Sequence, residues 1–415
     1  MRYNPLGRTG LGVAASLLLA YSSHAATAQQ CAPQLAYDAI VAAVTDRFYD
    51  KTFRGLDWTA RISHYRHAVH CDTQDAQVAA TANELLSELH ASHTAVYTRA
   101  DVGYWGLNSY FSKGEGQYKI YFSGIWPERR DGKWHAKYVF EGSAAARAGI
   151  SGGDELRQLN GKTFQPLAFG AGVSSVVISS DGESTRTVSL EPREESVVQA
   201  FVEASQASAR IAPLGAYQVG YFHLWTARDP ILQSLNSALS RFESQKVDAL
   251  IVDLRGGYGG TSPDYLSKIR DSSYLAGIPK VFLIDDGVRS GKELLAALIK
   301  RDAIGTLVGS RTAGAFLGAV PVRLIEDRYF LLVAAYGSIP MPGIGPIEGI
   351  GVTPDVEVAP CRARCRGRDP QLDRAMELIG SKLNALVYEP SQPCGRQFGA
   401  RAQLRSNISN AQCSR

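Results

Sequence analysis

Apolar residues recur at helical spacing in the first part of the chain. Between residues 33 and 89 the steps of three and four residues are carried by Ala36, Ile40, Val41, Val44 and Phe48. The segment 78–89 repeats the rhythm. Because this spacing places apolar side chains on one face of a helix, it predicts a small helical unit.

The pattern changes to short alternating runs in the next part of the chain. These runs are separated by Gly and Asp and are typical of strands. They occupy residues 118–122, 137–140, 176–178 and 185–190. We therefore predict a separate β-rich domain.

Beyond a polar stretch at residues 191–208, apolar runs alternate with helical patterns. The predicted strands are 217–224, 249–254, 281–285 and 306–309, and the predicted helices are 231–242, 263–269 and 290–300. Strands rich in Val, Ile and Leu that alternate with helices indicate an α/β layer around a largely parallel sheet.

These patterns give a multidomain α+β fold, in keeping with a length of 415 residues. The predicted partition is a signal peptide, an N-terminal helical domain carrying Ser92 and His93, a β-rich domain, an α/β core and a Cys-rich C-terminal extension. Their ranges are 1–28, 29–100, 101–200, 201–360 and 361–415.

The N-terminus has the order of a secretory signal. Arg2 and Arg8 precede an apolar run at 11–21, and small residues follow up to Ala28. The apolar run is too short to span a bilayer comfortably, so we expect no stable membrane span. Cleavage after Ala25 or Ala28 would give an exported protein, either periplasmic or secreted.

Charge and cysteine content narrow the possible partners. Lys and Arg number 44 against 40 Asp and Glu, a net charge too small to indicate a nucleic-acid partner. All six cysteines follow the cleavage sites, and an even number in an oxidising compartment favours disulfides. The simplest partition pairs Cys31 with Cys71 and leaves two bridges in the last 55 residues, with three possible connectivities. Zinc at Cys361 and Cys365 lacks a second close ligand pair, so no metal is expected.

The segment EGSAAARAGISGGDELRQLNGK at residues 141–162 resembles a PDZ domain. Its Asn160-Gly161 pair favours a hairpin turn without any family argument. The resemblance implies a peptide bound as an added strand, with its terminal carboxylate held on backbone N–H groups. The segment that best matches the carboxylate-binding loop comprises Ser123, Gly124, Ile125 and Trp126. An ordinary Gly-rich hairpin is the alternative.

Several motifs resemble peptidase family S41, the C-terminal processing and tricorn-like serine peptidases. In family order they are LHASHTAVY at 89–97, VDALIVDLRGGYGG at 247–260, VFLIDDGVRSGKELLAALIK at 281–300, LVGSRTAGA and IEGIGVTPD. The resemblance implies a crotonase/ClpP-like α/β peptidase core, a protein or peptide substrate and no cofactor.

Ser290 is the candidate nucleophile. It follows a buried strand and opens a helix, where unpaired N–H groups favour developing negative charge. A plain helix N-cap is the alternative. One branch of the family uses a later Lys as the base, but no lysine lies between Arg301 and Ser381, and Lys292 is two positions away, on another side of the helix.

The tricorn-like branch supplies a different base. The resemblance implies His93 as general base and acid, with Glu348 orienting the imidazole through Ser92. His90, three residues earlier, is the alternative base. Because the base must be neutral, hydrolysis is expected to fall below about pH 6.5.

The oxyanion requires two N–H donors. Gly291 is one candidate, and Gly259 or Gly257 of a glycine-rich turn is the other, since glycine lets a backbone N–H approach a ligand closely. Asp253 and Arg255 are expected to support that turn. Besides an active endopeptidase, the same scaffold would suit a non-catalytic exported peptide-binding protein, or a peptidase opened by a partner on its PDZ-like domain.

Overall fold

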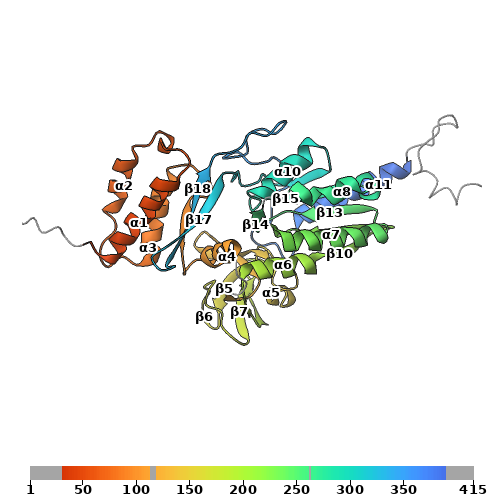
Figure 1. Cartoon of the computed structure of the whole chain (residues 1–415). Coiled ribbons are helices and arrows are strands. Elements are labelled where there is room, and N and C mark those ends of the chain that lie inside the picture. Colours follow the sequence, from red (N-terminus) through yellow and green to blue (C-terminus); the bar gives the residue numbers. More distant parts are fainter. Residues whose placement is uncertain (1–29, 113–117, 261–262, 389–415) are drawn as a thin grey trace, which may run out of the picture.

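The structure is a computed structural model that describes residues 30–112, 118–260 and 263–388 (Figure 1). The predicted signal peptide and the cysteines Cys394 and Cys413 lie outside the described residues. Within those ranges, no helix combines the length and the apolar character needed to cross a membrane.

The predicted apolar stripe forms the core of an N-terminal unit. Its helices are α1 (Ala32–Arg47), η1 (Phe53–Gly55), α2 (Trp58–Arg66) and α3 (Asp75–Ser87). Ala36, Ile40 and Val44 are fully buried, as the helical spacing requires. The predicted Cys31–Cys71 disulfide is present and ties the start of α1 to the segment before α3.

An antiparallel sheet completes this unit. Its strands have the order β1-β18-β17 and comprise β1 (Ala95–Thr98), β17 (Gly318–Leu324) and β18 (Tyr329–Tyr336). Leu331 and Val333 of β18 belong to the same buried cluster as the N-terminal helices. Residues 318–336 therefore pack on the N-terminal unit, although the sequence partition assigns them to the α/β core.

Residues 120–195 form the predicted β-rich part, called the β-unit below. It comprises β2 (Ile120–Phe122), β3 (Ile125–Arg130), β4 (Lys133–Val139), α5 (Ala144–Arg147), β5 (Glu155–Leu159), β6 (Lys162–Thr163), β7 (Ser174–Ser179), β8 (Arg186–Leu190) and β9 (Arg193–Glu195). Its main sheet has the order β3-β4-β5-β7-β8, so β3 lies at an edge. Asn160 and Gly161 both have positive φ and form the predicted turn between β5 and β6.

The predicted parallel sheet is the centre of the largest unit, called the α/β unit below. Its strands have the order β10-β11-β13-β15-β16-β19 and comprise β10 (Arg210–Leu214), β11 (Tyr217–His223), β13 (Ala249–Asp253), β15 (Lys280–Ile284), β16 (Thr306–Gly309) and β19 (Val356–Glu357). Only the pairing of β10 with β11 is antiparallel. β13 and β15 are buried along their whole length, which explains the consecutive apolar residues at 249–252 and 281–284.

Helices cover both faces of this sheet. One face carries α6 (Val197–Ser208), α7 (Asp229–Ser244), η2 (Pro263–Leu266), α8 (Ser267–Asp271), α9 (Ser273–Gly277) and α10 (Gly291–Arg301), and the other carries α11 (Pro370–Tyr388). Alternate residues of the strands serve the two faces. Leu250 packs in the cluster that includes α7 and α10, whereas Ile251 packs on the other face, with Ile379 of α11.

Some elements were not predicted from the local pattern. They include α4 (Val102–Phe111), α6, the short paired strands β12 (Thr226–Ala227) and β14 (Tyr258–Gly260), β17, β18 and α11. The sequence of residues 191–208 indicates a polar stretch, yet Val197, Phe201 and Ala204 bury one side of α6 against the core. In Figure 1, α4 lies between the N-terminal unit and the α/β layer.

Candidate active site

Ser290 occupies a strained backbone position at the start of α10. The turn 285–290, called the Ser290 turn, leaves the end of β15 in the middle of the parallel sheet. Ser290 has φ +55° and ψ −130°, a conformation that residues other than glycine rarely adopt. Its N–H donates to the carbonyl of Ala315 over 2.8 Å, which helps to hold the turn.

The glycines on either side of Ser290 are required by close packing. A Cβ on Gly259 would lie 2.5 Å from Cβ of Ser290 and 3.0 Å from the nitrogen of Gly291. A Cβ on Gly291 would overlap the carbonyl oxygen of Gly260. Two of the three candidate oxyanion glycines therefore meet at the candidate nucleophile.

Gly257 has a different environment. It has φ +65°, and a Cβ there would overlap the carbonyl of Trp225. This packing explains why the turn at residues 255–260 needs a glycine at position 257. Gly259 is the residue of the same turn that packs against Ser290.

Ser92, His93 and Glu348 are joined by hydrogen bonds. The hydroxyl of Ser92 donates to Oε2 of Glu348 over 2.8 Å and lies 3.0 Å from Nδ1 of His93. The backbone N–H of Ser92 donates to Oε1 of the same carboxylate over 2.9 Å. Since the single hydroxyl proton of Ser92 is directed to Glu348, Nδ1 of His93 donates to Ser92, and Nε2 keeps its lone pair.

Residues 315–317 connect this group to the Ser290 turn. Ala315 accepts from the Ser290 N–H, Phe316 donates to Oε2 of Glu348 over 2.7 Å, and Leu317 donates to Oγ of Ser92 over 3.3 Å. Two of the predicted catalytic side chains, Ser92 and Glu348, thus accept hydrogen bonds from this short segment, which also accepts the backbone N–H of Ser290. Among the described residues, no hydrogen bond joins His93 directly to Ser290.

His93 has the electrostatic character of a neutral base. Burial and the guanidinium of Arg289 lower its pKa to about 4, and Glu348 acts in the opposite direction. The sequence expectation used the ordinary histidine pKa of about 6.5. With the lowered pKa, the neutral form of His93 extends to a lower pH than that expectation allowed. The alternative base, His90, has an exposed side chain, and its carbonyl accepts a hydrogen bond of 2.5 Å from Arg54.

Glu293 was not among the predicted site residues. Its buried carboxylate accepts hydrogen bonds from Oγ1 of Thr312 over 2.5 Å and from the N–H groups of Gly314 and Ala315 over 2.7 and 2.8 Å. It also accepts from the Ser290 N–H over 3.3 Å. Burial raises its pKa despite these hydrogen bonds. The signal was present, since a Ser followed three residues later by Glu is the capping-box pattern at a helix start.

Lys292, which the sequence did not favour as the base, holds the backbone around the site. Its buried Nζ donates to the carbonyls of Leu224 and Trp225 over 3.1 and 3.4 Å, and also to the carbonyl of Gly256. Burial lowers its pKa to about 7, against the opposing effect of Asp285. The adjacent β11–β12 connection and the glycine turn, residues 255–260, are thereby fastened to α10.

Asp253 and Arg255 support the glycine turn as expected. Nη2 of Arg255 lies 2.5 Å from Oδ2 of Asp253 and 2.7 Å from Oδ2 of Asp369. Oδ1 of Asp253 also accepts the N–H of Arg255 over 3.0 Å. The turn is therefore anchored by charges on the central sheet and at the start of α11.

The predicted carboxylate-binding loop is buried in the β-unit. The carbonyl of Ser123 accepts from Ala145 N–H and that of Gly124 accepts from Phe140 N–H, each over 2.9 Å. The ring of Trp126 packs inward, 6.1 Å from that of Phe201. The Trp126 side chain is thus used for packing, and peptide binding here would rely on the edge of β3.

A small apolar cavity lies beside the hydrogen-bonded group of Ser92, His93 and Glu348. It has a volume of about 260 Å³, and Phe316, Ile339 and Ile347 contribute to its wall. Phe316 also donates to Glu348, so the cavity adjoins the segment that joins the two halves of the site. No group of three or more His, Cys, Asp or Glu within the described ranges is arranged to hold a metal ion.

Comparisons with known proteins agree with this architecture. Residues 261–358 match the model of peptidase family S41. The chain is 25% identical over 406 residues to "Putative tricorn protease homolog 2" of Streptomyces coelicolor, covering 87% of this chain and 33% of the relative. It is 23% identical over 356 residues to the chloroplastic carboxyl-terminal-processing peptidase 3 of Arabidopsis thaliana, covering 76% of this chain and 66% of the relative. The chain thus spans about a third of the length of the tricorn homolog.

Two solved structures share the fold. The photosystem II D1 C-terminal processing protease has a TM-score of 0.50 at 21% identity, covering 85% of this chain and 98% of that chain. The tricorn protease has a TM-score of 0.51 at 17% identity, covering 85% of this chain and 37% of that chain. At these identities the likeness concerns the fold.

Proposed function

Because residues 261–358 match the model of peptidase family S41, we propose that this protein is a serine endopeptidase whose nucleophile is Ser290. The observation that carries the proposal is the hydrogen-bonded group Ser92–His93–Glu348, which residues 315–317 connect to the Ser290 turn. Its substrate is a protein or a peptide.

In the proposed reaction, Oγ of Ser290 attacks the carbonyl carbon of a peptide bond and transfers its proton to Nε2 of His93. The developing imidazolium of His93 is stabilised by Glu348 through Ser92, because the proton on Nδ1 of His93 stays directed to Oγ of Ser92. Collapse of the tetrahedral intermediate breaks the C–N bond, and His93 returns the proton to the leaving amine. Water then attacks the acyl-enzyme by the same steps and releases the carboxylic acid.

The negative oxygen of the intermediate would be held by the N–H groups of Gly291 and Gly259. Gly291 is the first residue of α10, so its N–H has no acceptor within the helix. Its nitrogen and Gly259 lie together beside Ser290. Each such donor typically lowers the barrier by about 2.7 to 4 kcal/mol.

His93 must approach Ser290 during the reaction, since the two are not hydrogen-bonded. His93 belongs to the connection between α3 and β1, whereas Ser290 belongs to the α/β unit. Catalytic hydrogen bonds are often long in free enzymes and shorten when substrate binds. A small closure of the N-terminal unit over the α/β unit would bring the groups together.

We also propose that the protein is exported and that the β-unit is a PDZ-like peptide-binding domain. The disulfides Cys31–Cys71 and Cys361–Cys365 suit an oxidising compartment. The edge position of β3 suits addition of a peptide strand next to Ser123–Trp126. A free peptide C-terminus is the ligand that such a loop would take.

A fluorophosphonate probe tests the proposed nucleophile. We expect a covalent adduct on Ser290 in the folded protein, slower labelling in His93→Ala, and none in Ser290→Ala. Ser237→Ala is the matched control, because the exposed Ser237 hydroxyl donates only within α7, to the carbonyl of Gln233. A folded parent protein without an adduct would favour the non-catalytic peptide-binding alternative. Labelling of Ser290 only after addition of a peptide that binds the PDZ-like domain would indicate a peptidase whose active site opens when a partner binds that domain.

A further inference from the structure

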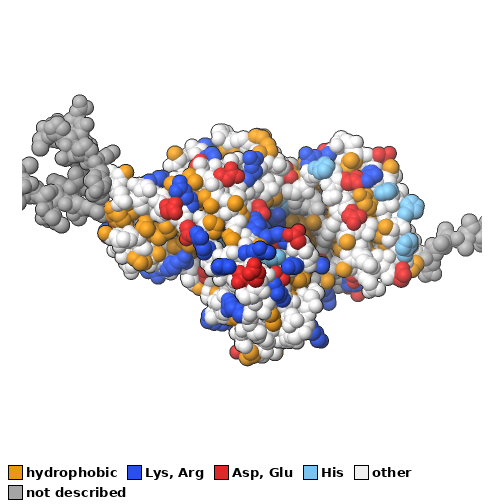
Figure 2. Space-filling view, turned by 180° about the vertical axis from the view of Figure 1, so that it is seen from behind, with side chains coloured by type: hydrophobic (Ala, Val, Ile, Leu, Met, Phe, Trp, Pro, Cys, Tyr) orange, Lys and Arg blue, Asp and Glu red, His pale blue; other side chains and the backbone are white. Residues whose placement is uncertain are grey.

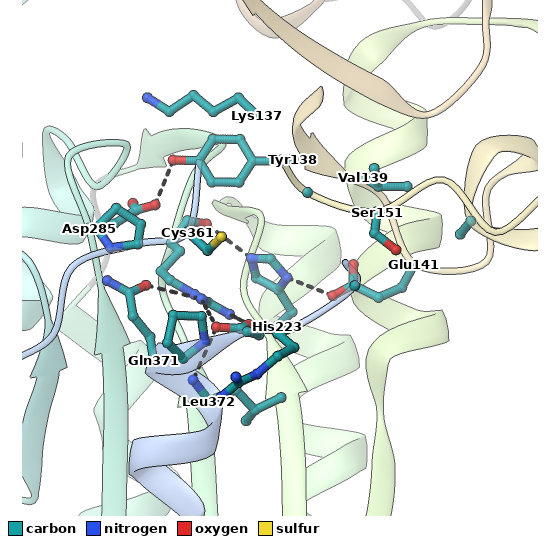
Figure 3. A pocket seen from close by; sticks show the side chains of 18 of the residues that line it. Lys137, Tyr138, Val139, Glu141, Ser151, His223, Asp285, Cys361, Gln371 and Leu372 are labelled. Carbon is teal, nitrogen blue, oxygen red and sulfur yellow. Dashed lines mark hydrogen bonds and ion pairs between the residues drawn. The ribbon is translucent and has the colours of Figure 1, made fainter. Parts of the chain in front are cut away.

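A charged cavity of about 380 Å³ lies where the β-unit, the central sheet and residues 360–372 meet (Figure 3). In Figure 2, side chains of both charge signs gather where the lower lobe joins the larger body. Tyr138 and Asp285, which are hydrogen-bonded to each other, both line this cavity. His223 also lines it and lies between Glu141 and the carbonyl of Arg255. Residues of the β-unit and residues of the α/β unit therefore both form the wall of this cavity.

Asp285 holds two parts of the candidate active site with one oxygen. Its Oδ1 accepts the N–H of Gly256 over 3.2 Å and the N–H of Gly287 over 2.9 Å. Gly256 lies in the glycine turn that carries Gly259, and Gly287 lies three residues before Ser290. Asp285 as a whole residue is only 2% exposed, so water cannot readily replace these hydrogen bonds.

The second oxygen of Asp285 is held by the β-unit. The hydroxyl of Tyr138, in β4, donates to Oδ2 over 2.7 Å. Burial and the neighbouring carboxylate raise the pKa of Tyr138 well above its usual value, so the hydroxyl keeps the proton that it donates.

The contact between Tyr138 and the two turns is tight. A Cβ on Gly256 would lie 2.9 Å from the ring of Tyr138, and a Cβ on Gly287 would overlap its hydroxyl. The adjacent Asp286 forms ion pairs with Lys137, over 3.2 Å, and with Arg362. Two consecutive carboxylates of the Ser290 turn are thus held by two consecutive residues of β4.

We propose that Tyr138 and Asp285 are positioning residues, through which the placement of the β-unit sets the position of the oxyanion donors and of Ser290. This inference rests on the proposed function and adds a specific connection between the β-unit and the catalytic turns. Tyr138 acts through Asp285 and does not touch the reacting atoms. A peptide or partner that displaced β4 would release Asp285 on one side and loosen both turns.

The test compares Tyr138→Phe with Tyr121→Phe. Tyr138→Phe keeps the ring and removes only the hydroxyl donor. Tyr121 lies in β2 of the same unit, and its hydroxyl has no hydrogen bond to another described residue, so Tyr121→Phe is the matched control. The readouts are kcat and KM on a quenched fluorescent peptide mixture, and hydrogen exchange of the segments 255–260 and 285–290.

For Tyr138→Phe we expect kcat to fall about tenfold to hundredfold, because displacement of a catalytic group by about 1 Å costs up to about hundredfold. KM should stay within about twofold of the parent, and exchange should be faster in both segments, with the parent behaviour in Tyr121→Phe. An unchanged kcat with unchanged exchange in Tyr138→Phe overturns the inference, as does an equal loss in Tyr121→Phe. If the parent hydrolyses nothing, the proposed function fails, and the exchange comparison still decides whether Tyr138 holds the turns.

Discussion

Oγ of Ser92 donates a hydrogen bond of 2.8 Å to Oε2 of Glu348, although the two residues lie 256 positions apart. The same carboxylate accepts the N–H groups of Ser92 and Phe316. One side chain therefore fixes the connection that carries His93 and the segment next to Ser290. This arrangement makes Glu348 the link between the two halves of the proposed active site.

Replacement of Glu348 by glutamine should reduce turnover. The carboxylate accepts three hydrogen bonds through both oxygens, whereas an amide turns an NH₂ group toward at least one of these donors. We expect kcat to fall about 30- to 150-fold, equivalent to the loss of about 2 to 3 kcal/mol for a charged hydrogen bond. Initial rates on a peptide substrate measure this effect.

Glu326→Gln is the control for this substitution, because Glu326 is exposed on the turn between β17 and β18. It should behave as the parent. If Glu348→Gln also retained full activity, Glu348 would have no role in orienting His93.

The acid limit of activity should lie well below the usual histidine pKa. Burial and Arg289 lower the pKa of His93 to about 4. Because the neutral imidazole is the proposed base, kcat/KM of the free enzyme should stay high below pH 6.5 and fall only as the pH drops through about 4. A pH–rate profile, with activity rechecked at pH 7 after acid exposure, measures the midpoint.

Arg289→Gln should move this midpoint upward, since it removes the nearby positive charge. Arg99→Gln is the control, because the exposed Arg99 is not among the charges that shift His93. A midpoint near pH 6.5 in the parent, unchanged in Arg289→Gln, would argue against His93 in this environment as the base.

Lys292→Met should lower both stability and labelling at Ser290. The buried Nζ donates to three backbone carbonyls, and methionine leaves them without this donor. We expect the free energy of unfolding to fall by about 2 to 4 kcal/mol. Urea unfolding and the rate of fluorophosphonate labelling measure the two effects.

Lys162→Met, at an exposed position in β6, is the matched control and should change neither quantity. Parent-like stability in Lys292→Met would show that the carbonyls around the glycine turn do not depend on this lysine.

The two described disulfides should contribute unequally to stability. Cys31–Cys71 closes a separation of 40 residues, whereas Cys361–Cys365 closes a separation of four. From the chain entropy of the unfolded state, removal should cost about 4 kcal/mol for the first and about 2 kcal/mol for the second. Urea unfolding of Cys31→Ser/Cys71→Ser and Cys361→Ser/Cys365→Ser compares them, and an equal or reversed order contradicts the entropic account.

Local patterns in the sequence were sufficient for much of the fold. The spacing of Ala36, Ile40 and Val44 predicted α1, and unbroken apolar runs predicted the buried parallel strands β13 and β15. Such patterns work because a helix or strand buries a face that is defined by its own residues. They failed for β18, whose pairing with β1 joins segments more than 200 residues apart.

Motifs in the sequence were enough to name the candidate residues: Ser290 at a strand-to-helix turn, Ser92 and His93 together, Glu348, and the glycines of two turns. The folded chain was needed to show that Ser92, His93 and Glu348 share hydrogen bonds and that Gly259 rather than Gly257 packs on Ser290. It was also needed to show that Glu293, Lys292 and Asp285 hold the backbone around the site. The physical reason is that the His93 environment and the position of the turns arise from burial and from hydrogen bonds between distant segments. A pKa near 4 or a carboxylate shared by two turns has no counterpart in local sequence pattern.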